Sequence, residues 1–127
     1  MAYYFLSSCD LLQKMRLNKL DTLSFLLAAV CHDLGHDGMT NSYHVNAMTD
    51  RAIDFNDVSV QESFHAAEFF RIMNETELNF LEDISRDQYK VFRKRVLGLI
   101  LSTDMAQHAS FAKFFKGLLS EYGIENG

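Results

Sequence analysis

Residues 23–41 read LSFLLAAVCHDLGHDGMTN, an apolar run followed directly by two histidines, two aspartates and two glycines. Leucine and valine side chains recur in the run at helical spacing, and the phenylalanine and alanines between them widen the apolar face. We expect a deeply buried helix here, with Asp21 as its N-cap and with Gly35 and Gly38 ending it. The polar cluster would then lie at the C-terminal end of a rigid, core-forming helix.

The remainder of the chain also reads as helix and short loop, without internal repeats or a competing strand pattern. The 127 residues contain no proline, which favours long uninterrupted helices. Ser59 with Glu62, and Ser85 with Gln88, have the spacing of capping boxes at helix starts. The expected fold class is therefore all-α, a helical bundle in one domain over residues 1–127. Helices are expected at residues 3–17, from a cap at Asn41 or Ser42 to about 51, at 59–73, and at 85–119 with a bend within 102–111.

Composition indicates a soluble globular protein and excludes several classes. Hydrophobic residues make up 48% and charged residues 23%, and the net charge is -5 with scattered basic residues, so nucleic-acid binding is not expected. The longest apolar run, residues 25–31, is far shorter than the roughly 18 residues of a membrane span. No secretory signal opens the chain. Cys9 and Cys31 fit neither a zinc knuckle nor a disulfide framework, which indicates a reducing compartment, and we expect the cytoplasm.

His32 and Asp33 are candidate metal ligands because they are adjacent at a helix end. A neutral imidazole there can bind zinc, while the neighbouring carboxylate reaches the same ion with one oxygen and a second, harder ion with the other. Two-metal hydrolases use such a site to hold a hydroxide between ions about 3.5–4 Å apart, where it attacks phosphorus. The alternative is that His32 only interacts with the helix dipole and that Asp33 is solvated. The dipeptide alone does not decide between them.

Further polar residues could surround such a site. His36, on a glycine-flanked loop, could hydrogen-bond a metal-bound water or be an ordinary loop histidine. Glu62 could face the site or only cap its helix. Thr103 and Asp104 interrupt an apolar helix face, so they either face solvent or are hydrogen-bonded. Asp104 and His108 also have the spacing of a simple surface pair on a helix.

Three segments together resemble a known family. HDLGHDGMTN at 32–41, NDVSVQESFH at 56–65 and ILSTDMAQH at 100–108 stand in the order found in class I 3',5'-cyclic nucleotide phosphodiesterases, which are HD-superfamily phosphohydrolases. The resemblance runs from about Tyr3 to the end of the chain. It implies hydrolysis of cAMP or cGMP, the cyclic nucleotide substrate, to the 5'-monophosphate in signal transduction. It also implies two divalent cofactors, Zn²⁺ and Mg²⁺ or Mn²⁺, and a histidine that protonates the departing 3'-oxygen.

The resemblance also implies roles for individual residues. His32 matches the zinc-ligand histidine, and Asp33 matches the aspartate shared by zinc and the second metal. Asp33 and His36 are thereby the expected catalytic residues. His44 matches an apolar position of the family and is expected to be an ordinary histidine. The positions expected to hold water molecules of the second metal or to form the inner polar network are His36, Asn41, Glu62, His65, Thr103 and Asp104.

The chain also departs from the family pattern. Asp37 stands where the family usually has proline, and we expect this to loosen the turn or change its local charge. Ser63 and Phe64 replace an asparagine and a histidine, which leaves His65 as the single histidine of that segment. The family's upstream HNxxH segment and its downstream purine-binding part have no counterpart here. We therefore expect residues 1–127 to be a central fragment of a catalytic domain, with little or no activity alone.

Two alternatives to this interpretation stay open. A different HD-type phosphohydrolase could act on nucleoside phosphates or cyclic dinucleotides, although such enzymes are not expected to share the second and third segments. A non-catalytic helical module could instead bind a partner or self-associate through exposed core surface, because only about half of a metal site is present. Aggregation or self-association of the isolated chain would favour this second alternative.

Overall fold

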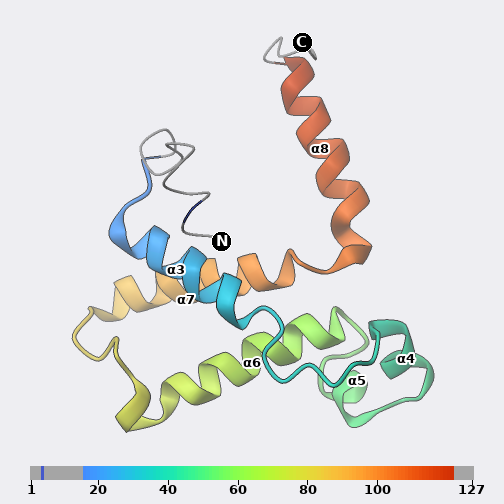
Figure 1. Cartoon of the computed structure of the whole chain (residues 1–127), viewed down its shortest axis with the longest axis horizontal. Coiled ribbons are helices and arrows are strands. Elements are labelled where there is room, and N and C mark those ends of the chain that lie inside the picture. The colour runs from blue at the N-terminus through green and yellow to red at the C-terminus, as the bar shows by residue number, and fades with distance from the viewer. Residues whose placement is uncertain (1–3, 5–15, 122–127) are drawn as a thin grey trace.

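The computed structural model describes Tyr4 and residues 16–121, and every regular element among them is a helix, which confirms the all-α class. The helix expected at residues 3–17 lies almost entirely outside the described residues. No described helix is long and apolar enough to cross a membrane. The elements, labelled as in Figure 1, are α3 (Lys19–Cys31), α4 (Asn41–Asn46), α5 (Asp50–Asp54), α6 (Val60–Asn74), the 3-10 turn η1 (Thr76–Leu78), α7 (Arg86–Leu101), the 3-10 turn η2 (Met105–Gln107) and α8 (His108–Glu121).

Helix α7 packs against both α3 and α6 and forms the centre of the bundle. Phe92, Val96 and Ile100 recur at helical spacing on α7, and none of the three is exposed to solvent. The Phe92 ring lies 6.5 Å from that of Phe69 and 6.4 Å from that of Phe70, both on α6. This aromatic contact fixes the two helices against each other. The short helices α4 and α5 contact α6 and one another.

Helix α3 begins at a different cap residue than predicted and is less buried than predicted. Asn18 is the N-cap: its side chain accepts from the Asp21 N–H, and the Asp21 carboxylate accepts from the Asn18 N–H, both at 2.9 Å. Asp21 therefore completes a capping box at the third helical position and is not the cap itself. Only Ser24 and Ala28 of α3 are buried, and Val30 is 79% exposed. The prediction of deep burial was wrong because only one face of α3 lies on the core.

Capping explains three more helix starts. The box formed by Ser85 and Gln88 is confirmed, with the Gln88 N–H donating to Ser85 Oγ at 3.2 Å. The helix expected from residue 41 to 51 is instead two short helices, and each is capped by a threonine hydroxyl, Thr40 for α4 and Thr49 for α5. The chain therefore turns between the two short helices, and α5 reaches the loop at 32–40 through a hydrogen bond from Arg51 to the Gly35 carbonyl.

The capping box expected at Ser59 and Glu62 does not form. Helix α6 begins at Val60 as predicted, but Ser59 has a left-handed backbone with φ 44° and makes no side-chain cap bond. An N-cap residue normally has extended backbone angles, from which its side chain reaches the first turn. The Ser59 hydroxyl instead donates to the Asp104 carboxylate at 2.6 Å, which ties the start of α6 to the end of α7.

The long helix expected at 85–119 is broken, not bent. Helix α7 ends at Leu101, and the hydroxyls of Ser102 and Thr103 donate back to the carbonyls of Leu99 and Ile100, both at 2.7 Å. Such bonds compete with continuation of the helix. Asp104 then caps η2 by accepting from the backbone of the next turn. The chain restarts as α8, which points away from the other helices in Figure 1 and has no buried residue.

Truncation of Phe92 to alanine is expected to lower the free energy of unfolding by about 3–5 kcal/mol, the usual cost of emptying a fully buried aromatic site. Chemical denaturation of residues 1–127 followed by circular dichroism measures this. Val91→Ala is the matched control, because Val91 is the neighbouring residue on the same helix and is 43% exposed. A loss no larger for Phe92→Ala than for the control would contradict the central place of α7.

Candidate metal centre

His32 and Asp33 lie at the end of α3, with His32 as the C-cap residue. His32 Nδ1 lies 3.0 Å from the Ala29 carbonyl oxygen, and because a carbonyl can only accept, the ring proton is on Nδ1. Nε2 then carries a lone pair, and it lies 3.1 Å from Asp33 Oδ2. Two lone pairs at this distance repel unless a cation lies at them, either a proton on Nε2 or a metal ion.

The same arrangement fits a metal ligand pair. Metal-binding histidines commonly donate their second ring N–H to a backbone carbonyl, which fixes the ring as the Ala29 carbonyl fixes His32. Nitrogen and oxygen ligands lie about 2.1 Å from zinc, so two of them in a tetrahedral set are about 3.4 Å apart. The observed 3.1 Å between His32 Nε2 and Asp33 Oδ2 is close to that spacing. The donor set therefore suits a divalent cation.

His65 on α6 is brought to the same place. Ligand atoms of Asp33, His36 and His65 all lie within 4.8 Å of one another. His65 is only 1% exposed, and its Nδ1 donates to the Leu34 carbonyl at 2.7 Å, which leaves a lone pair on Nε2. Burial lowers the pKa of His65 below 6.5, although the Leu34 bond and the Asp33 charge oppose this, so the ring is neutral near pH 7. His65 is thus prepared as a ligand or as a hydrogen-bond acceptor.

The neutral His36 ring carries its proton on the other nitrogen from that of His65. Its Nδ1 accepts the Gly38 N–H at 2.8 Å, so in the neutral ring the proton lies on Nε2. The His36 ring stacks on that of His65 with 5.6 Å between ring centres. A donor at Nε2 suits a water molecule or a phosphate oxygen, and does not suit a metal cation. Of these three residues, Asp33 and His65 can therefore bind a metal ion, whereas His36 can donate a hydrogen bond to a water molecule or phosphate oxygen bound to that ion.

The loop that carries His36 depends on its two glycines. Gly35 has φ +72° and Gly38 has φ +84°, conformations that other residues adopt at a cost. A Cβ on Gly35 would also lie 3.0 Å from the Phe64 ring. Helix α3 already ends at Cys31, with His32 as its C-cap, so the expectation that these glycines end the helix was wrong; they shape the loop that follows it.

A cavity of about 430 Å³ beside this site brings together several residues singled out in the sequence. Asn41 donates to the Glu62 carboxylate at 2.8 Å and accepts the Gln61 N–H at the same distance, which orients Glu62 across from the loop. Glu62 therefore makes a tertiary contact in place of the expected helix cap. The cavity lining includes His36, Asn41, Glu62 and Asp104.

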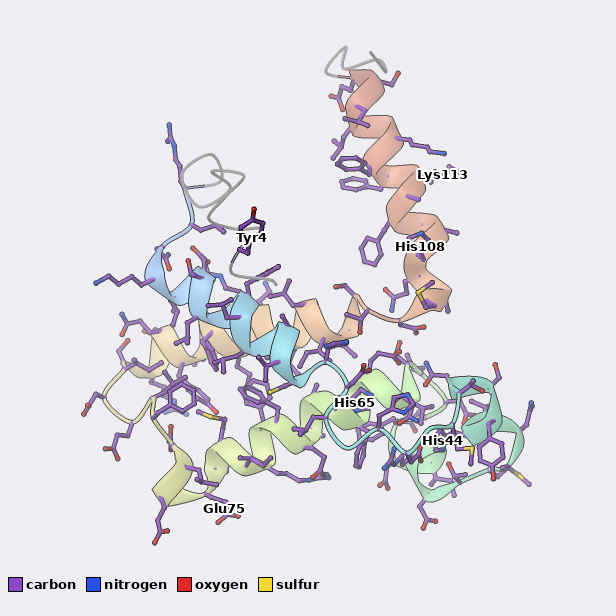
Figure 2. All side chains as sticks on the ribbon, viewed as in Figure 1. Tyr4, His44, His65, Glu75, His108 and Lys113 are labelled. Atoms are coloured by element: carbon purple, nitrogen blue, oxygen red, sulfur yellow. The ribbon has the colours of Figure 1, made fainter. Side chains whose placement is uncertain are left out.

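Thr103 and Asp104 are placed differently from each other. Thr103 lines a smaller cavity of about 300 Å³ together with His32. Asp104 is 8% exposed and accepts from Ser59, so it is not the surface partner of His108 considered from the sequence. Figure 2 shows His108 on α8, away from His65 and His44. Asp104 thus joins the inner network, while Thr103 lies on the His32 side.

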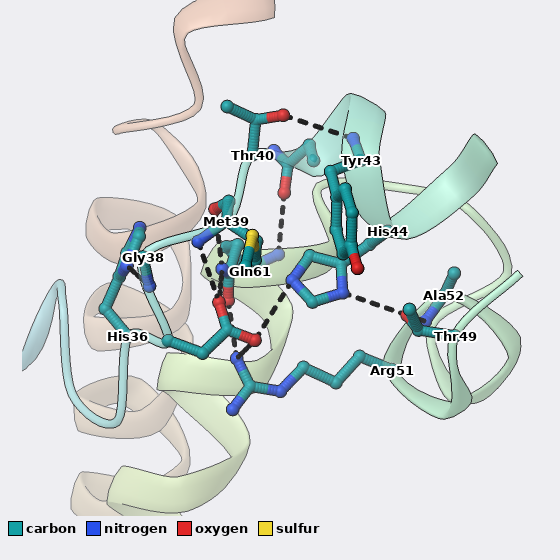
Figure 3. A network of polar contacts seen from close by, with 12 residues as sticks. His36, Gly38, Met39, Thr40, Tyr43, His44, Thr49, Arg51, Ala52 and Gln61 are labelled. Carbon is teal, nitrogen blue, oxygen red and sulfur yellow. Dashed lines mark hydrogen bonds and ion pairs between the residues drawn. The ribbon is translucent and has the colours of Figure 1, made fainter. Parts of the chain in front are cut away.

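A second polar network, around Asp37, was largely missed from the sequence. One Asp37 oxygen accepts from the Gln61 side chain at 2.6 Å and from the Met39 N–H at 3.1 Å. The other oxygen lies 3.2 Å from Arg51 and 3.3 Å from Nε2 of His44, a contact that falls short of hydrogen-bond geometry. Figure 3 shows how these side chains converge from α4, α5 and α6 on the loop beside His36. Asp37 therefore anchors the turn: of its two expected effects, the loosening was wrong, and the changed local charge is the one found.

The network accounts for the charge of Asp37 and the burial of His44. Partial burial raises the pKa of Asp37, but the bonds from Met39 and Gln61 and the charges of Arg51 and His44 outweigh it and lower the pKa to about 2. His44, expected to be an ordinary histidine, is 3% exposed, and its Nδ1 lies 2.9 Å from the Thr49 hydroxyl. The unusual Asp37 was the only sequence signal for this network.

Comparison with known proteins agrees with the geometry. Residues 1–126 match the family model described as 3'5'-cyclic nucleotide phosphodiesterase. The chain is 41% identical over 114 residues to the 3',5'-cyclic-nucleotide phosphodiesterase regA of Dictyostelium discoideum, covering 90% of this chain and 14% of the relative. It is 38% identical over 126 residues to the human high affinity cGMP-specific 3',5'-cyclic phosphodiesterase 9A, covering 99% of this chain and 21% of the relative.

A solved structure gives the same result for the fold. The phosphodiesterase domain of the RhoPDE fusion protein from the choanoflagellate Salpingoeca rosetta superposes with a TM-score of 0.72 at 37% identity, over 74% of this chain and 30% of that one. The chain spans only about a seventh to a fifth of the length of the curated relatives, 14% and 21% for the two named above. The match of nearly all residues to one family model, together with these relatives, shows that the chain belongs to the 3'5'-cyclic nucleotide phosphodiesterase family.

Proposed function

We propose that the protein containing this chain hydrolyses 3',5'-cyclic nucleotides, cAMP or cGMP, to the 5'-monophosphates with the aid of divalent metal ions. The observation that carries the proposal is the 3.1 Å spacing of His32 Nε2 and Asp33 Oδ2, with the His32 ring held by the Ala29 carbonyl, in a chain of this family. The cytoplasm remains the proposed compartment, on the grounds of the cysteine content.

Zinc and magnesium or manganese are the proposed cofactors, and the residues present are chemically suited to them. His32 and Asp33 would hold zinc, with the second Asp33 oxygen and the neighbouring polar groups available to magnesium or manganese. A bound divalent ion supplies Lewis acidity, which polarises a phosphate oxygen and makes water acidic enough to be the nucleophile at neutral pH. Imidazole and carboxylate ligands are consistent with this choice of ions.

The chain's own side chains would then orient the substrate and water. His36 carries a donor at Nε2, and its ring lies close to the Asp33 carboxylate, so it can hold a water molecule or a phosphate oxygen in place. The lone pair on His65 Nε2 can accept a proton of that water. The Asn41–Glu62 pair lines the adjoining cavity, where its carboxylate can accept hydrogen bonds from further water molecules. Proximity and orientation of this kind contribute directly to rate.

Metal binding is the first prediction of the proposed function. Isothermal titration of residues 1–127 with Zn²⁺ is expected to give a dissociation constant that Asp33→Asn raises at least about tenfold, the lower end of what even outer partners of a metal contribute. The control is Asp87→Asn, because the Asp87 side chain is 92% exposed and lies at the start of α7. Equal zinc affinity in Asp33→Asn and the control would contradict the proposed site.

Hydrolysis is the second prediction. Because residues 1–127 contain no HNxxH motif, we expect them to hydrolyse little cAMP or cGMP alone, and to do so when they replace the matching segment of the S. rosetta domain. In that chimera Asp33→Ala should lower kcat/KM at least about 100-fold, or about 2.7 kcal/mol of transition-state stabilisation. Chromatographic assay of the 5'-monophosphate measures this. A folded, metal-binding chimera without activity would overturn the proposed function.

Self-association through α8 is a second candidate property, favoured by one observation. Phe111, Phe114 and Phe115 are 47%, 66% and 60% exposed on a helix that has no buried residue, and apolar patches of this kind mark contact surfaces. We propose that a second copy of the chain covers them, because two such faces would bury each other's rings.

Sedimentation velocity tests the association. Residues 1–127 are expected to sediment as more than a monomer with rising concentration, and the double variant Phe111→Ser, Phe114→Ser as a monomer. Met48→Ser is the control, because Met48 is 77% exposed and lies between α4 and α5. A wild-type chain that stays monomeric at every concentration would exclude this association.

A further inference from the structure

The loop that presents His36 is held from both sides by one guanidinium group. Arg51 of α5 donates from one terminal nitrogen to the Gly35 carbonyl at 3.2 Å, and its other terminal nitrogen lies 3.2 Å from the Asp37 carboxylate. Gly35 and Asp37 are the residues immediately before and after His36. Figure 3 shows the Arg51 side chain reaching from α5 toward Gln61 and the loop that carries His36.

Arg51 is itself held in place. Its guanidinium lies 3.6 Å from the centre of the Phe64 ring and donates to the Gln61 side-chain oxygen at 2.7 Å. The side chain is only 23% exposed, so these contacts are partly shielded from water. A planar guanidinium can serve several acceptors at fixed angles, which an ammonium group on a flexible stem cannot reproduce. Both Phe64 and Gln61 belong to α6, so Arg51 links the loop to a rigid helix.

Two turn bonds support the start of the loop, from the Leu34 N–H to the Cys31 carbonyl and from the His36 N–H to the Asp33 carbonyl, both at 3.1 Å, but its two glycines weaken it. Gly35 and Gly38 both have positive φ angles, and glycine loses more conformational freedom on ordering than any other residue. The bond from the Gly38 N–H to His36 Nδ1, which fixes the ring proton on Nε2, therefore depends on the backbone between the two glycines. The contacts of Arg51 and Asp37 restrain that backbone.

We propose that Arg51 is a positioning residue that acts through the loop to fix the orientation and tautomer of His36. Arg51 is not one of the residues of the candidate metal centre; it clamps Gly35 and Asp37, and this holds the backbone that pairs His36 Nδ1 with the Gly38 N–H. The importance of the His36 donor at Nε2 for catalysis rests on the proposed function, whereas the clamp itself is a property of the fold.

The test observes the His36 ring directly, in the metal-free chain. Nitrogen-15 NMR of the imidazoles in residues 1–127, held at pH 8, is expected to show His36 in the single Nε2–H tautomer. Arg51→Met should cause loss of that single-tautomer pattern, and so should Arg51→Lys, because a lysine cannot clamp both sides of the loop. Zinc affinity at His32 and Asp33 should change less than about twofold, since neither is a contact of Arg51.

Arg93→Met and Arg93→Lys are the matched controls. The Arg93 guanidinium also lies over a phenylalanine, 4.1 Å from the Phe70 ring centre, but on α7 and away from the loop. These variants should leave the His36 signals unchanged. If Arg51→Met fails to fold, Arg51→Lys decides the question. An unchanged His36 tautomer in the folded Arg51 variants would overturn the proposal, whether or not the chain binds zinc or supports hydrolysis.

Discussion

The contact of α7 with both α3 and α6 is the constraint on which the rest of the molecule depends. Phe92 and Ile100, fully buried on α7, hold the two flanking helices in place. The end of α3 carries Asp33, which contacts His32, and α6 carries His65, so the same packing brings Asp33 and His65 to one region. Close packing in the core leaves little freedom for these helices to slide. The positions of the candidate ligands therefore depend on the packing of α7 as well as on their own hydrogen bonds.

Backbone groups then decide what each imidazole can do. The carbonyls of Ala29 and Leu34 accept from His32 and His65, which leaves their Nε2 atoms as lone-pair donors. The Gly38 N–H donates to His36 instead, which makes its Nε2 a proton donor. His32 and His65 thus present a lone pair at Nε2, whereas His36 presents a proton there. That division is the one needed to hold a cation and also to orient an oxygen of its ligand.

Much of this could be predicted from the sequence, and the failures have physical causes. The all-α class and the Ser85 capping box depend on local patterns, and both are confirmed, whereas α3 ends at Cys31, before Gly35 and Gly38. The Ser59 capping box failed because the spacing says nothing of the left-handed backbone there. The ligands implied by the HD motif stay proposals. The Asp37 network could not be foreseen because its members come from four separate segments and meet only in the folded chain.

The central claim is that His32 and Asp33 share a metal ion. X-ray absorption spectroscopy at the zinc edge of the zinc complex of residues 1–127 tests it most directly. The account predicts only nitrogen and oxygen neighbours, at about 2.0–2.2 Å, with the outer scattering of at least one imidazole. Cys31 directly precedes His32, and its thiol is the competing ligand on the same helix end. A sulfur neighbour at about 2.3 Å, or a zinc complex without imidazole scattering, would contradict the claim.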